Sequence, residues 1–276
     1  MNLSKSIELL KKIKDGKNYD KEYNFTLNSP KEEQISAEEI VEKFSKEDFE
    51  YIEEKIENLK KSALYTRKSQ IHGKKHIENV MLFAMIISLY ENLSIKDRDL
   101  LLEAAVYHDQ GRVNDIDEQH GTESAYIAGE ELKDKYSDDE LKIIQAAIIF
   151  HDDRTKGNSL QEIEDIGFKN ITKKLNIREE EISRARKIGN ILKDADALDR
   201  ARFIEDTIPI DERYLRTDIS KKMIKVAMEL HEAISLSELN LIINNESDSV
   251  KEQIKKYLEE MSPIRVKQFY LYNIIK

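Results

Sequence analysis

The chain has 276 residues, carries a formal net charge of −10 and contains no cysteine. The lack of thiols excludes disulfide bonds and thiolate zinc sites, and the acidic balance disfavours general binding to nucleic-acid backbones or anionic membranes. Only 8 glycines and 3 prolines occur, which together with frequent Lys, Glu, Ile and Leu is typical of helical proteins.

Capping patterns and apolar periodicity predict an all-α chain. A serine followed three residues later by an acidic residue favours a helix start, as at Ser36, Ser137 and Ser249, and more weakly at Ser94. The final segment VKQFYLYNIIK fits either a short docking helix or an edge strand. We predict helices over residues 3–14, 37–64 with a break near Ser45, 73–91, 97–108, 121–134, 138–151, 160–175, 178–203, 218–236 and 248–260.

The histidines and aspartates that stand out as possible functional residues all lie in the middle of the chain, between His76 and Asp196. We therefore predict an N-terminal helical extension over residues 1–60 and a metal-binding helical core over residues 61–236. Residues 237–276 are expected to form a C-terminal helical extension that packs on this core.

Histidines and aspartates lie where the predicted apolar stripes begin or end. His76 precedes Val80 by one turn, His108 extends the stripe that contains Ala104, and His151 follows Ile148 at stripe spacing. A buried polar group needs a partner, and a buried charge needs one more strongly. Metal ions would satisfy these groups together, and a ligand set of His, Asp and Glu favours iron, manganese, magnesium or a nitrogen/oxygen zinc site.

Three segments, IHGKKHIENV, AAVYHDQGRVND and LKDADALDR, carry the ordered pattern H…HD…D. Over about residues 65–205 the chain resembles the HD-domain superfamily of metal-dependent phosphohydrolases. His120 in EQHGTESA and His151 in IIFHDD stand where the dinuclear members carry two further histidines. The resemblance implies an all-α HD-domain helical bundle, here with additional N- and C-terminal helices.

The resemblance also implies two divalent metal ions, with iron or manganese preferred and magnesium, zinc, nickel or cobalt as alternatives. The second ion would be held by His120 and His151, and Asp109 would bridge both ions. A bridging hydroxide of lowered pKa would then attack phosphorus, which makes Asp109 and Arg112 the expected catalytic residues. The ligands expected for the first ion are His76, His108, Asp109 and Asp196.

Two choices of histidine stay open in this pattern. His72 and His76 are four residues apart and share a helix face. We prefer His76, because the family histidine usually precedes an apolar residue by four positions and Val80 supplies it. The pair His151–Asp152 is a second HD dipeptide, and we prefer His108–Asp109 because HDQGR is closer to the family's form.

The sequence also offers several candidates for the final aspartate of the motif and for the residues that contact the substrate. LKDADALDR offers Asp194, Asp196 and Asp199. The family's usual sequence around this aspartate, AD-x-L, favours Asp196. Arg112 stands where many dinuclear relatives carry Lys, and Arg can hold a phosphate oxygen through two hydrogen bonds. The expected substrate-binding residues are His72, Lys75, Arg112, Arg200 and Arg202.

The resemblance implies a metal-dependent phosphohydrolase or phosphodiesterase that acts on a nucleotide-like phosphoester or phosphoanhydride. The alternatives are an HD-type di-iron oxygenase and a metal-binding regulatory module without turnover. The expected partner is a small phosphorylated or nucleotide substrate, with no membrane and no general nucleic-acid binding, and a homo-oligomer is left open. No signal-peptide pattern and no apolar run of ~20 residues is present, so we expect a cytoplasmic protein.

Overall fold

The computed structural model of the protein describes residues 33–62, 72–112, 120–153, 159–202, 210–244 and 247–260. Within these ranges every regular element is a helix, so the predicted all-α class is confirmed. The helix predicted over residues 3–14 and the apolar segment at the C-terminus lie outside the described residues. Among the residues described, no helix is both long and apolar enough to cross a bilayer.

The chain divides into two compact units, which are described separately. The larger unit contains Ser45–Ala197 and Leu215–Ser220. The smaller unit contains Met1–Phe44, Leu198–Tyr214 and Lys221–Lys276. The division predicted from the sequence, at residues 60 and 236, stays a prediction.

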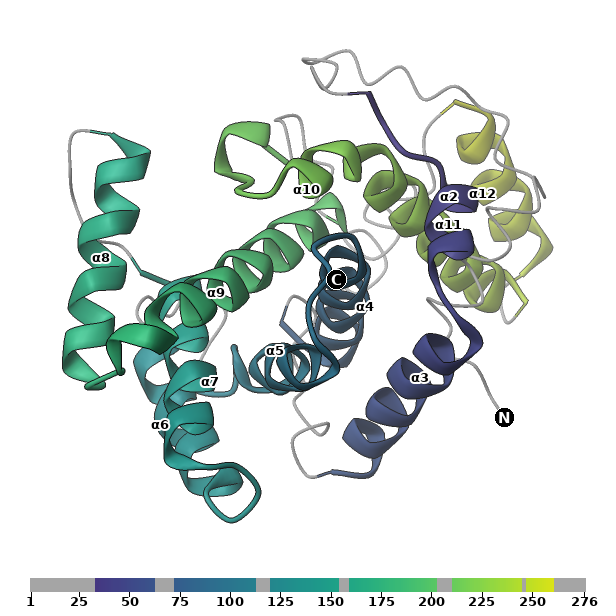
Figure 1. Cartoon of the computed structure of the whole chain (residues 1–276). Helices are drawn as coiled ribbons and strands as arrows, with labels where there is room; N and C mark the ends of the chain where they lie inside the picture. The colour runs from purple at the N-terminus through teal and green to yellow at the C-terminus, as the bar shows by residue number, and fades with distance from the viewer. Residues whose placement is uncertain are drawn as a thin grey trace. The chain divides into compact units, whose positions relative to one another are not determined.

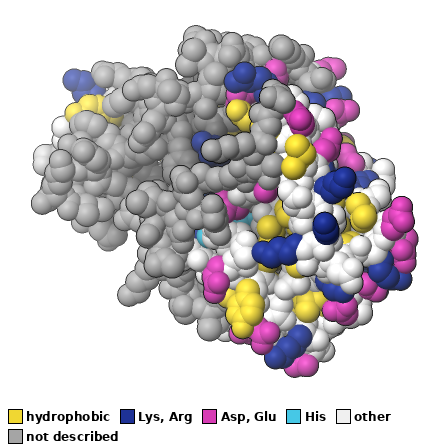
Figure 2. Space-filling view, turned by 90° about the vertical axis from the view of Figure 1, so that its left-hand side faces the viewer, with side chains coloured by type: hydrophobic (Ala, Val, Ile, Leu, Met, Phe, Trp, Pro, Cys, Tyr) yellow, Lys and Arg dark blue, Asp and Glu magenta, His cyan; other side chains and the backbone are white. Residues whose placement is uncertain are grey.

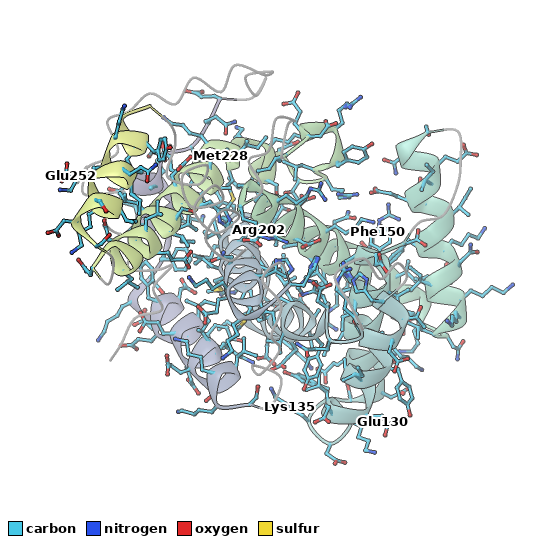
Figure 3. All side chains as sticks on the ribbon, turned by 180° about the vertical axis from the view of Figure 1, so that it is seen from behind. Glu130, Lys135, Phe150, Arg202, Met228 and Glu252 are labelled. Atoms are coloured by element: carbon cyan, nitrogen blue, oxygen red, sulfur yellow. The ribbon has the colours of Figure 1, made fainter. Side chains whose placement is uncertain are left out.

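The larger unit is a bundle in which consecutive helices pack on one another. Helix α4 packs on α3 and α5, α5 contacts α6 and α7, and α7 lies against α6 and α8 (Figure 1). Glu130 lies in the last turn of α6, and Lys135 lies in the turn just beyond the end of that helix (Figure 3). The helices of this unit are α3 (Lys46–Lys61), α4 (Lys74–Tyr90), α5 (Ile95–Tyr107), α6 (His120–Leu132), α7 (Asp138–His151), α8 (Leu160–Lys174) and α9 (Glu179–Asp199), whose last two residues belong to the smaller unit.

Serine caps explain where several helices begin. Ser36 and Ser137 each form the predicted capping box, and Ser94 accepts a hydrogen bond from the backbone N–H of Asp97. The break predicted near Ser45 is present, because Ser45 caps α3 with a box of its own. The prediction at Ser249 was wrong, since Ser249 is the second residue of a helix that begins at Asp248.

Helix α4 has almost no solvent-facing side along most of its length. Every residue from His76 to Ser88 is buried, so the apolar stripe read from the sequence underestimates how much of α4 the bundle covers. Charged side chains on neighbouring helices remain at the surface, where Lys and Arg alternate with Asp and Glu over the described face (Figure 2). Helix α4 is therefore a central helix of the larger unit, and it delivers His76 into the interior.

The smaller unit includes the last two residues of α9 and the elements that follow them. The predicted helix over 178–203 stops at Asp199 and continues as the 3-10 helix η2 (Arg200–Arg202), against which α11 (Ile224–Ile243) packs. Arg202 and Met228 mark these two elements in Figure 3. The predicted helix over 218–236 is two helices, the longer α11 and α10 (Asp218–Lys222), whose first three residues belong to the larger unit. The remaining elements are α2 (Ala37–Lys43), η3 (Glu212–Tyr214) and α12 (Asp248–Glu260).

Candidate metal centre

All six predicted metal ligands and His72 come together in the larger unit. They are placed by helix ends: His76 lies in the first turn of α4, His120 begins α6 and His151 ends α7. Three overlapping groups have ligand atoms within 4.8 Å of one another. These groups are His72, His76 and Asp109; His76, His108 and Asp196; and His108, Asp109 and His151.

The first half of the centre is built from His76 and His108. Their Nε2 atoms lie 3.0 Å apart. Oδ2 of Asp109 lies 3.3 Å from Nε2 of His76 and 3.6 Å from Nε2 of His108. Oδ1 of Asp196 approaches the same two nitrogens to 3.4 and 4.0 Å. Two imidazoles and two carboxylates therefore face one point.

The second half is built from His120 and His151. Their Nε2 atoms also lie 3.0 Å apart. The other oxygen of Asp109, Oδ1, lies 2.8 Å from Nε2 of His120 and 3.8 Å from Nε2 of His151. Asp109 thus presents one carboxylate oxygen to each pair of histidines.

Hydrogen bonds at the far ring nitrogens orient these imidazoles. Nδ1 of His108 donates to the carbonyl oxygen of Ala105 over 2.7 Å, and Nδ1 of His151 donates to the carbonyl oxygen of Ile148. A carbonyl oxygen only accepts, so in the neutral ring the proton is on Nδ1 and the lone pair is on Nε2. Both rings therefore turn a lone pair toward the shared centre, as metal-binding histidines do.

The protonation states of the centre suit a cation. Burial lowers the pKa of His108 to about 3, so its ring is neutral at physiological pH. Burial alone would raise the pKa of Asp109, but the contacts of its carboxylate with His108, His120, His151 and His72 outweigh burial and hold that pKa well below the usual range. Burial would also raise the pKa of Asp196, but the nearby imidazoles of His76 and His108 outweigh it and lower that pKa. Ionised carboxylates and neutral imidazoles are the forms that bind metals.

The residues present fit divalent cations. The Nε2 lone pairs of His108 and His151 each lie 3.0 Å from the Nε2 atom of a second imidazole, and a proton or a cation between the two nitrogens satisfies both of them. Oxygen and imidazole donors without thiolate suit iron, manganese or zinc. The arrangement therefore favours divalent metal ions.

The structure separates the three aspartates at the end of α9. Oδ1 of Asp196 faces His76. Asp194 instead accepts hydrogen bonds from the backbone N–H groups of Arg216 and Thr217, each over 2.8 Å. The third aspartate, Asp199, lies in the smaller unit, where it pairs with Arg202 and His231. The choice of Asp196 therefore agrees with the geometry.

The predicted substrate-binding residues fall into two groups. Nδ1 of His72 lies 2.8 Å from Oδ2 of Asp109, and Nε of Arg112 donates to Oδ1 of Asp109 over 2.7 Å. Lys75 is exposed in the first turn of α4. Arg200 and Arg202 belong to the smaller unit, so their substrate role stays a prediction, as does that of Lys75.

Asp152 is a functional candidate that the motif reading did not assign. Its Oδ2 lies 3.2 Å from Nδ1 of His120 and accepts a hydrogen bond from the backbone N–H of Gly121. The sequence signal was the second HD dipeptide, His151–Asp152, whose aspartate supports a neighbouring histidine. Such carboxylate–histidine contacts fix the ring that binds a metal.

Comparison with known proteins gives one match. Residues 73–201 match the family model described as HD domain. This stretch contains the ligands of both halves of the centre, from His76 to Asp196. No curated protein and no solved structure matches the chain significantly.

Proposed function

We propose that this chain, whose residues 73–201 form an HD domain, is a metal-dependent phosphohydrolase. Its substrate would be a small nucleotide-like phosphoester or phosphoanhydride. Proteins with this domain are mostly metal-dependent hydrolases, which supports the reaction class. The chain's own geometry supports the dinuclear form of the enzyme.

One observation carries the proposal. The two oxygens of Asp109 each face a different pair of histidine nitrogens, with closest distances of 3.3 Å to His76 and 2.8 Å to His120. His76, His108 and Asp196 would hold one ion with Asp109, and His120 and His151 would hold the second with the same carboxylate. When bound, two divalent cations supply Lewis acidity that activates water and neutralises phosphate oxygens.

The chain's own residues would position the substrate beside this centre. A guanidinium presents five N–H donors in a planar fork, and the bond from Arg112 to Asp109 is made by Nε. Arg112 therefore lies beside the centre, where its guanidinium would bind a phosphoryl oxygen. His72, whose side chain is 15% exposed, would line the same opening. The metal ligands His76, His108 and His120 are covered almost completely.

The test combines metal analysis with product release. The purified protein is loaded with Mn²⁺ or Fe²⁺, its metal content is measured by mass spectrometry, and phosphate or nucleoside release is followed over a panel of nucleotides. Asp109→Ala is the site variant. Asp134→Ala is the matched control, because it removes the same charge at an exposed position.

The proposal predicts two ions per chain and release of product from at least one phosphoester, with both lost in Asp109→Ala and kept in Asp134→Ala. A fully loaded protein that releases nothing from the panel refutes the hydrolase. Oxygen consumption together with a mixed-valence iron signal would assign the centre to oxygenase chemistry instead.

A further inference from the structure

Both histidines proposed for the second ion depend on the C-terminal end of α7. His151, the last residue of α7, is one of them. Asp152 follows it, and Oδ2 of Asp152 lies 3.2 Å from Nδ1 of His120, the other histidine. The last turn of a helix has carbonyl groups without helical partners and frays easily. A second ion at this place therefore needs a contact from outside α7 that holds the end of the helix.

Lys193 of α9 makes such a contact. Its Nζ donates to the carbonyl oxygen of Phe150 over 2.8 Å and lies 4.2 Å from the centre of the ring of the same residue. The carbonyl of Phe150 and the backbone nitrogen of His151 belong to one planar peptide group, so the bond restricts where His151 can lie. A cation at the C-terminal end of a helix is also favoured by the helix dipole.

Close packing between α7 and α9 brings Lys193 to this carbonyl. A Cβ added at Gly189, one turn before Lys193, would lie 3.0 Å from Cδ1 of Phe150 and 3.6 Å from the Cα atom of Ala147. Phe150, labelled in Figure 3, is fully buried, and its ring centre lies 5.0 Å from that of Phe168 in an edge-to-face contact. The ammonium of Lys193 thus binds a residue whose side chain is already fixed by packing.

The fold keeps the charge of Lys193 at a cost in stability. Burial, together with the charge of Arg216, lowers the pKa of Lys193 to about 8, so the folded chain disfavours the ammonium relative to the unfolded chain. The carbonyl oxygen of Phe150 also accepts a hydrogen bond from the backbone N–H of Asp153 over 3.3 Å, so it has a partner without the lysine. Neither stability nor the pairing of this carbonyl explains the ammonium, which points to a role in the neighbouring centre.

We propose that Lys193 is a positioning residue for the second metal ion, because it fixes the end of α7 that carries His151 and Asp152. The inference rests on the dinuclear centre of the proposed function. Lys193 lies on α9, three residues before Asp196, a ligand of the first ion. If Lys193 only supported α9, its loss would weaken the first ion at least as much as the second. An anchor of α7 affects the second ion alone.

The test measures Mn²⁺ affinity, by competition with a chelator, in full-length chains that keep one ion each. Asp196→Ala is the background for the second ion, and His120→Ala is the background for the first. Lys193→Met is introduced into both, since methionine is a flexible, uncharged side chain that fills irregular gaps. Lys187→Met is the matched control, because Lys187 also lies on α9 and donates Nζ over 2.8 Å to a backbone carbonyl at a helix end, that of Glu91 after α4.

We expect Lys193→Met to lower the affinity for the second ion about 10–100-fold, the usual effect of removing a residue that orients a metal ligand, and to change the affinity for the first ion less than about twofold. Lys187→Met should change neither affinity, and circular dichroism verifies the fold of each variant. The inference is overturned if Lys193→Met leaves the second ion unchanged, weakens both ions alike, loses the fold, or is matched by Lys187→Met. If the Asp196→Ala background binds no ion at all, the dinuclear centre of the proposed function fails, and the inference fails with it.

Discussion

Oδ2 of Asp152 lies 3.2 Å from Nδ1 of His120. Nε2, the other nitrogen of that ring, faces His151 and Asp109. The imidazole of His120 is therefore held between a supporting carboxylate on one side and the candidate metal centre on the other. This contact distinguishes His120 from His108 and His151, whose Nδ1 atoms contact backbone carbonyls.

Asp152→Asn should weaken the binding of one ion and leave the binding of the other unchanged. The amide keeps an oxygen for the N–H of Gly121 but gives up the negative charge that makes the His120 ring a better donor. We expect about 10–100-fold lower affinity for the second ion and unchanged affinity for the first, measured by competition with a chelator. Equal loss of both ions would contradict the role of Asp152.

Asp109→Ala should remove both ions, whereas Asp196→Ala should remove one. The reason is that the two oxygens of Asp109 face both histidine pairs, while Asp196 approaches only His76 and His108. Metal-to-protein ratios after dialysis measure the difference, with circular dichroism to verify the fold. Retention of two ions in Asp109→Ala would rule out a bridging carboxylate.

Arg112→Gln should reduce turnover while the metal content stays at its original value. We expect kcat/KM to fall about 10²–10³-fold, the usual effect of removing a donor that stabilises transition-state charge. Arg112→Lys should recover only part of the activity, since a lysine lacks the planar fork. If metal is lost in parallel with activity, Arg112 acts by holding Asp109 instead of the substrate.

Gly111→Ala should destabilise the protein, because there is no room for a methyl group after the HD pair. An added Cβ would lie 2.5 Å from the backbone nitrogen of Ser124 and 2.7 Å from the carbonyl oxygen of His120. Both atoms belong to the backbone at the start of α6, which cannot yield easily, so we expect a loss of about 1–3 kcal/mol in the free energy of unfolding, measured in urea.

The control for that variant is Gly129→Ala. There the added Cβ meets the flexible end of Gln145, and alanine is favoured over glycine by about 1 kcal/mol in a helix interior. We expect its free energy of unfolding to change little. If both variants lost similar stability, the cause would be a general sensitivity of helix α6 to substitution. The close contact between residue 111 and the backbone of α6 would then not explain the loss.

Lys193 should give the protein a measurable pH dependence of stability. Burial, reinforced by the charge of Arg216, lowers the pKa of Lys193 to about 8. Between that value and its ordinary pKa the unfolded chain holds the proton and the folded chain does not, so stability rises with pH across this window. Below about pH 8 both states are charged and the cost of burying the charge is fully present.

Comparison with Lys193→Met isolates this effect. From pH 7 to pH 10 we expect the free energy of unfolding of the unmodified protein to rise relative to the variant, on the order of 2 kcal/mol. Other lysines and tyrosines titrate in both proteins and cancel in the difference. A difference that does not change with pH would show that the Lys193 pKa is ordinary.

Much of the fold was predictable because its signals are local. The Ser36 and Ser137 caps depend on neighbours three residues away, and the helices beginning at Asp138 and Leu160 start where the pattern predicts. Ser249 shows the limit of this reasoning, since its spacing to an acidic residue also occurs inside a helix. The full burial of α4 depends on which helices surround it, which periodicity within α4 does not contain.

Which residues gather at the candidate centre was predictable from the sequence, whereas the residues that support them were not. His76, His108 and Asp196 carry a family pattern that residue order alone reveals. The partners of Asp194 lie in a segment more than twenty residues away, at Arg216 and Thr217, and no local pattern connects them. Supporting contacts of this kind depend on tertiary structure, which is why the role of Asp152 appears only with the coordinates.

The placement of Asp194 and Asp196 on different faces of α9 limits how this segment can change in length. Inserting or deleting one residue between Ala185 and Asp194 would turn both carboxylates by about 100° relative to the first half of the helix. A helix would still form locally, yet neither carboxylate would keep its partners. Homologous chains with the same centre should therefore vary in length within their loops and keep a constant number of residues along α9.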